Sequence, residues 1–119
     1  MEEKNIILKG AKIAEYTLEN LGYPQDKIEK VKHCIYAHRG SQNIKPESLE
    51  ANLLIQADAM SNFDNIAGII KAAIVYEGKT QAEAKKHVFE KLTNKWNQLS
   101  DYAKELVEEK YNAVKVLFG

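Results

Sequence analysis

Apolar residues recur every three or four positions along most of the chain, which is the pattern of amphipathic helices. The first such stretch predicts a helix from Asn5 to Leu21, and the second predicts a helix from Pro24 to His38. Gly22 is a good stop residue for the first helix, and Pro24 suits the first turn of the next. We therefore expect the two helices to be neighbours joined by a short loop.

A polar loop from Arg39 to Lys45 separates these helices from a third, which the sequence predicts to open at Pro46. The glycine and serine in this loop break the helical pattern. Residues 62–64 are predicted to be a second break, and a fourth helix is predicted from about Asn65 to Glu77, where Gly78 ends it.

Two cap signals predict the last two helices. Thr80 and Glu83 have the spacing of a capping box, and Ser100 is a suitable N-cap. The apolar face predicted for the last helix consists of Ala103, Leu106, Val107, Tyr111, Val114, Leu117 and Phe118. No useful length of sequence alternates between apolar and polar residues as a strand does. The sequence therefore predicts an all-α fold of about six helices in a compact bundle.

Composition narrows the class of protein. The 119 residues suit one domain, and the 17 basic residues balance the 17 acidic ones. A zero net charge disfavours a general nucleic-acid or membrane-surface binder, since both usually need a basic excess. The single cysteine, Cys34, and the charged start of the chain indicate a cytoplasmic protein without a signal peptide. No apolar run approaches the roughly 20 residues that a membrane span needs.

Candidate chemistry concentrates in residues 31–64. At about 100° per residue, His38 falls within the apolar stripe of its helix, whereas His33 points away and should meet solvent. Asp58 lies on or beside the apolar face of the third helix. An uncompensated buried carboxylate is costly, so Asp58 needs a cation, a metal or several hydrogen-bond donors. Cys34 lies on an apolar face and is predicted to be a core thiol.

Five groups of residues together resemble the HD-domain superfamily. They are Gly10–Ala11–Ile13–Ala14, Leu21–Gly22–Tyr23, Ile35–Tyr36–Ala37–His38–Arg39, Leu49–Glu50–Ala51 and Gln56–Ala57–Asp58–Ala59–Met60. The resemblance covers residues 1–78, which are similar to the later helices of an HD domain, and it makes residues 79–119 a C-terminal helical pair. It implies an HD-domain-like bundle.

The resemblance also implies a function, because members of this superfamily are mostly metal-dependent phosphohydrolases that act on nucleotides and other phosphate esters. Asp58 matches the final aspartate of the family's metal site and His38 matches a later histidine, while Arg39 and Lys45 are placed to meet a phosphate. The implied cofactor is a divalent metal (Mn, Fe, Ni, Zn or Mg), and the implied ligand is a phosphate-containing small molecule.

The sequence departs from the family pattern in one important respect. It contains no His-Asp doublet, and two ligands fall short of the three that a catalytic metal normally needs. We therefore expect the chain to be incomplete, as part of a longer protein or a shortened member, and inactive alone. The alternative is a non-catalytic helical binding or assembly domain. Apolar surface on the Ile7–Ala11–Ala14 face, or near His38 and Asp58, is expected to be covered by a second copy or by the C-terminal helices.

Overall fold

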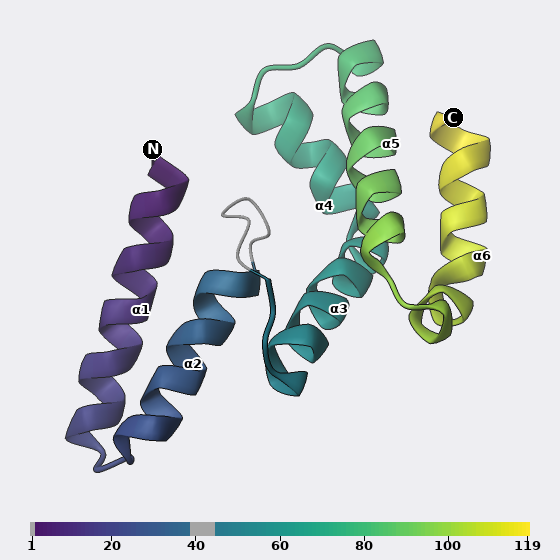
Figure 1. The fold of residues 1–119 in the computed structure, drawn as a ribbon. Coiled ribbons are helices and arrows are strands. Elements are labelled where there is room, and N and C mark those ends of the chain that lie inside the picture. The colour runs from purple at the N-terminus through teal and green to yellow at the C-terminus, as the bar shows by residue number, and fades with distance from the viewer. Residues whose placement is uncertain (1, 39–44) are drawn as a thin grey trace. The chain divides into compact units, whose positions relative to one another are not determined.

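The structure is a computed structural model that describes residues 2–38 and 45–119, with side chains from Ile6 onward. This described part is all-helical and contains no strand, as the sequence predicts (Figure 1). Its elements are α1 (Glu2–Asn20), α2 (Gln25–His38), α3 (Leu49–Asp64), α4 (Ile66–Lys71), the π-helical turn η1 (Ala72–Tyr76), α5 (Gln81–Gln98) and α6 (Asp101–Phe118). None of the helices described is long and apolar enough to cross a membrane.

Contacts divide the chain into two compact units, Met1–Ile55 and Gln56–Gly119. The boundary falls inside α3, so the first turns of this helix belong to one unit and the rest to the other. The expectation of a single domain stays a prediction.

The first unit is built on a helical hairpin in which α1 and α2 lie side by side (Figure 1). Gly22 adopts a positive φ of 80°, and the Tyr23 N–H donates to the Leu18 carbonyl at 3.0 Å. This is a Schellman motif, which stops α1 and turns the chain into α2. Ile7 and Ala11 are buried. This part of the α1 face is therefore covered within the chain itself, and the alternative of apolar surface near His38 and Asp58 stays a prediction.

The third helix begins and ends later than its sequence predicts. It starts at Leu49, after Ser48, whose hydroxyl accepts the Ala51 N–H at 3.1 Å. It continues through the predicted break to Asp64, because Phe63 is buried and the side chain of Asn62 donates back to the Asp58 carbonyl. These polar residues satisfy the helix locally instead of ending it.

The stop and start signals between the fourth and fifth helices are confirmed. Gly78 has a positive φ of 67° after η1. Both halves of the capping box are formed, because the Thr80 hydroxyl accepts the Glu83 N–H and the Glu83 carboxylate accepts the Thr80 N–H, each at 3.2 Å. These hydrogen bonds with Thr80 lower the pKa of Glu83. The Ser100 cap of α6 is also present.

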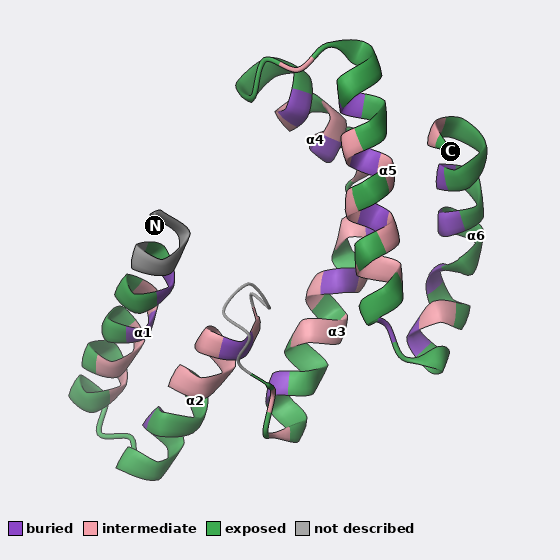
Figure 2. Ribbon diagram, turned by 45° about the horizontal axis from the view of Figure 1, so that its top comes forward, coloured by how far each residue is buried: buried purple, intermediate pink, exposed green. Residues whose placement is uncertain are grey.

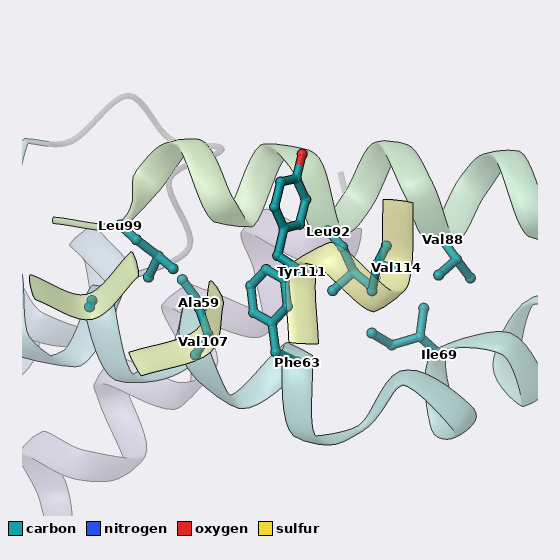
Figure 3. Close-up of a cluster of buried hydrophobic side chains, with 10 residues drawn as sticks. Ala59, Phe63, Ile69, Val88, Leu92, Leu99, Val107, Tyr111 and Val114 are labelled. Atoms are coloured by element: carbon teal, nitrogen blue, oxygen red, sulfur yellow. The ribbon is translucent and has the colours of Figure 1, made fainter. Parts of the chain in front are cut away.

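The second unit has its own apolar core, centred on Tyr111 of α6 (Figure 3). The Phe63 ring meets Tyr111 edge to face at 6.0 Å, and the Trp96 ring stacks on it at 4.5 Å. The Tyr111 hydroxyl lies 3.1 Å from the hydroxyl of Thr93, so its polar end is satisfied. Leu92 of α5 is fully buried in the same cluster.

Part of the apolar face predicted for the last helix is exposed instead of buried (Figure 2). Leu106 is 57% exposed, and Leu117 is exposed as well. They lie on a different side of α6 from Val107, Tyr111 and Val114, which face the core. The helix thus has two apolar sides, of which the second unit covers one.

Leu92 is buried in this core and Leu106 is exposed on α6, so replacing each leucine with alanine should change the stability of the protein by different amounts. Leu92→Ala should lower the free energy of unfolding by about 2–5 kcal/mol, because it removes a fully buried side chain. Leu106→Ala should change it by about 0.5 kcal/mol or less. Urea titration followed by circular dichroism measures both. Equal losses would contradict the burial described for α6.

Candidate functional site

Asp58 has a compensating cation, which is one of the three kinds of partner predicted for it. Its Oδ2 atom lies 3.2 Å from Nζ of Lys95, a residue of α5. The Asp58 side chain is 39% exposed and that of Lys95 is 23% exposed, so the pair lies at the surface of the second unit. The carboxylate is therefore both charge-compensated and open to solvent.

The core of the second unit fixes the backbone on both sides of this pair. Ala59, next to Asp58, is fully buried, and Trp96, next to Lys95, stacks on Tyr111. The two charged side chains thus project from helices that are held by apolar packing. Side chains on packed helices are better placed for function than side chains on loops.

Gln56 makes a second polar link close to this pair. Its Nε2 donates to the Gln98 carbonyl and its Oε1 accepts the Ser100 N–H, each at 2.8 Å. These backbone groups flank the short turn between α5 and α6, so one amide fastens both sides of that turn to α3. The sequence gives no local signal of this role, because the partners of Gln56 are more than 40 positions away.

His38, the other predicted metal ligand, ends α2 in the first unit. It is half-buried, and its Nδ1 atom lies 3.3 Å from the Ile35 carbonyl. Asp58 belongs to the second unit. The hypothesis that both residues bind one metal therefore stays a prediction. Arg39 lies outside the described residues, and Lys45 is exposed. Their proposed phosphate contacts also stay predictions.

His33 is not the solvent-facing side chain that helix geometry predicts. It is half-buried, and its Nε2 atom accepts the Glu47 N–H at 2.9 Å. This bond requires the neutral ring, because a protonated imidazole has no free acceptor. His33 thus holds the segment before α3 against α2. Glu47 is 14 positions away along the chain, so periodicity within α2 could not reveal the contact.

The implied divalent metal needs donor atoms of a suitable chemical type and in sufficient number. Imidazole and carboxylate are ordinary ligands of divalent transition metals, and Asp58 offers a partly exposed carboxylate. A catalytic site usually takes three protein ligands. Among the described side chains of residues 6–38 and 45–119, no three or more of His, Cys, Asp or Glu come together as such a site would need.

Lys95 is the important residue that sequence reasoning missed. The predicted need of Asp58 for a cation was the correct signal, and it is confirmed by the ion pair. The sequence could not choose the partner, however, because many lysines are spread along the chain and this one is 37 positions away. Only the packing of α5 beside α3 selects it.

A double-mutant cycle on Asp58→Asn and Lys95→Gln should give a coupling energy of about 0.2–1 kcal/mol, because both side chains are partly exposed. The coupling should decrease as salt is added. Urea unfolding of the four proteins measures it. The reference is the exposed i,i+4 pair Lys86–Glu90, whose charges are 4.0 Å apart and which should couple by no more than about 0.3–0.5 kcal/mol. A salt-independent coupling for Asp58 and Lys95 would contradict this surface geometry.

No protein-family model, curated protein or solved structure matches this chain. The resemblance to the HD-domain superfamily therefore rests on the residue patterns alone.

Proposed function

We propose that this chain is an HD-domain-like helical protein that supplies part of a metal-dependent phosphohydrolase site and is inactive as a hydrolase by itself. The proposal is supported by the sequence resemblance around His38 and Asp58 and by the all-helical fold. Its substrate class is a nucleotide or another small phosphate ester.

The observation that carries the proposal is the Asp58–Lys95 pair. A partly exposed carboxylate on a packed helix can bind a divalent cation, and an ammonium group beside it can bind a phosphate oxygen. Carboxylate and lysine side by side are therefore suited to a metal and an anionic phosphate that bind together. Arg39 and Lys45 would add positive charge, as the resemblance implies. Further metal ligands, with His38 among them, would complete the site, as the resemblance implies.

Lys95 and a metal ion would compete for the carboxylate of Asp58. Removing the carboxylate and removing the lysine should therefore change the metal-induced shift in melting temperature in opposite directions. Manganese should raise the melting temperature of the wild-type chain, because a ligand that binds only the folded state stabilises it. Asp58→Asn should remove most of this shift, whereas Lys95→Gln should enlarge it. Thermal melting across a manganese titration measures all three, and nickel, zinc, iron and magnesium identify the preferred ion.

The matched control is Asp64→Asn, which changes another exposed carboxylate of α3 that pairs with a lysine, Lys110. It should leave the metal-induced shift unchanged. His38→Ala tests whether His38 contributes to the same site. Turnover of p-nitrophenyl phosphate should be absent for the chain alone. A metal shift of equal size in the wild type and in Asp58→Asn would overturn the proposal.

A second candidate function, a helical assembly domain, is favoured by the exposed apolar stripes of α1 and α6. On α1 the stripe has the spacing of one side of a coiled coil and consists of Ile6, Lys9, Ile13 and Tyr16. On α6 an exposed stripe with the same spacing consists of Leu106, Glu109, Ala113 and Val116. Exposed apolar rows of this kind commonly mark interaction surfaces.

The two stripes are complementary in register. When they are aligned in parallel, Ile6 faces Leu106, and Lys9 faces Glu109 in the next layer. Ile13 then faces Ala113, and Tyr16 faces Val116. Opposite charges in one layer of an otherwise apolar seam specify the partner and the register. We propose that α1 of one copy pairs with α6 of a second copy in this arrangement.

Charge reversal tests this pairing. Lys9→Glu and Glu109→Lys should each weaken self-association about ten-fold, because each places like charges in one layer. The double variant should restore it. Sedimentation equilibrium measures the association constant, and Lys12→Glu, outside the stripe on α1, is the control. A wild-type chain that stays monomeric at all concentrations would show that second copies do not pair in this way.

A further inference from the structure

The hairpin of the first unit contains a hollow of about 490 Å³ that neither proposed function uses. Small-molecule sites usually have volumes of about 300–1,000 Å³ and mostly apolar walls. The hollow is lined by Leu18, Tyr23, Lys27, Lys30, Val31, Cys34 and Glu50. Its size and its mixture of apolar and cationic groups are those of a site for a small amphipathic molecule.

The sequence builds this hollow locally. Leu18 and Tyr23 occupy the two positions of the Schellman motif whose side chains usually touch, so the stop of α1 places one apolar wall. On α2, Lys27, Val31 and Cys34 follow one another at spacings of four and three, which puts them on one side of the helix. The hollow therefore depends on a stable hairpin and does not require the second unit.

The charges at the hollow are unequal. Lys27 and Lys30 make no ion pair with any residue of the described ranges, whereas Lys32, on the same helix, is held by Glu15 of α1 at 2.5 Å. The hydrogen bond to Glu15 raises the pKa of Lys32. Glu50 is the acidic residue of the lining, so two cations face one anion. An anionic group is favoured there over a neutral or a cationic one.

We infer that this hollow binds a small molecule with an apolar body and an anionic group, such as a carboxylate, sulfonate or phosphate. The apolar body lies along Leu18, Tyr23 and Val31, and the anionic group lies beside Lys27 and Lys30. Cys34 is the only cysteine of the chain, is half-buried and lies in the wall, so its accessibility reports whether the hollow is filled. The prediction of a core thiol is thus wrong.

The experiment compares two dyes that differ by one anionic group, 8-anilinonaphthalene-1-sulfonate and its uncharged parent N-phenyl-1-naphthylamine. The full-length chain should bind one sulfonate dye saturably and more tightly than the parent, and the bound dye should slow the reaction of Cys34 with iodoacetamide. Lys27→Gln and Lys30→Gln should each weaken binding of the sulfonate dye about two- to five-fold, as expected for exposed charge pairs. Glu50→Gln should strengthen it by a similar factor.

The controls separate this site from adventitious dye binding. Lys12→Gln, which removes an exposed lysine outside the hollow, should leave both affinities unchanged. Val31→Trp should fill the hollow and weaken the binding of both dyes. Circular dichroism checks that this variant remains helical. About 1 M salt should abolish the preference for the sulfonate.

Three results with the dyes would overturn the inference. The first is equal binding of the two dyes. The second is a preference that Lys27→Gln, Lys30→Gln and Glu50→Gln do not change. The third is a Cys34 reaction rate that the dye does not alter. Binding to anionic lipid vesicles without binding of the free dye would also overturn it, because the anion would then belong to a membrane surface. None of these readouts involves phosphate ester hydrolysis or manganese, so the outcome is independent of the proposed function.

Discussion

The packing of Tyr111 against Phe63 and Trp96 is the interaction on which the second unit depends. The Tyr111 ring makes a T-shaped contact with an aromatic side chain of α3 and stacks on one of α5, so three helices meet at a single residue of α6. Aromatic pairs contribute more than their buried area alone, and their geometry restricts how the helices can slide. The hydroxyl of Thr93 meets the polar end of Tyr111, which removes the cost of burying it.

The candidate site depends on this packing. Trp96, which stacks on Tyr111, is the neighbour of Lys95, so the aromatic stack sets the register of α5 against α3. That register brings the ammonium group to Asp58 and the end of α5 to the amide of Gln56. A shift of one helical turn would separate both links. The chemistry proposed for Asp58 therefore needs an intact apolar core more than it needs the ion pair, which lies partly in solvent and adds little stability.

Local sequence signals predict most of the fold, whereas the site depends on distant contacts. Gly22, Gly78 and the Thr80–Glu83 capping box act within a few residues, so their outcomes follow from the sequence. The extension of α3 to Asp64 could not be predicted in the same way, because it depends on burial of Phe63 by other helices. Likewise, the pattern identified Asp58 as a carboxylate in need of a cation but could not identify Lys95.

Helical periodicity also leaves open which of two apolar sides a helix buries. In α1 the side containing Ile7 and Ala11 is covered while that of Ile13 is exposed, and in α6 Val107 is covered while Val116 is 84% exposed. Both rows have apolar residues at spacings of three and four, so the pattern fits either. What distinguishes them is charge: the exposed rows contain Lys9 and Glu109, and such side chains are costly to bury without a partner. A charged residue inside an apolar row thus marks the side of the helix that the fold leaves exposed.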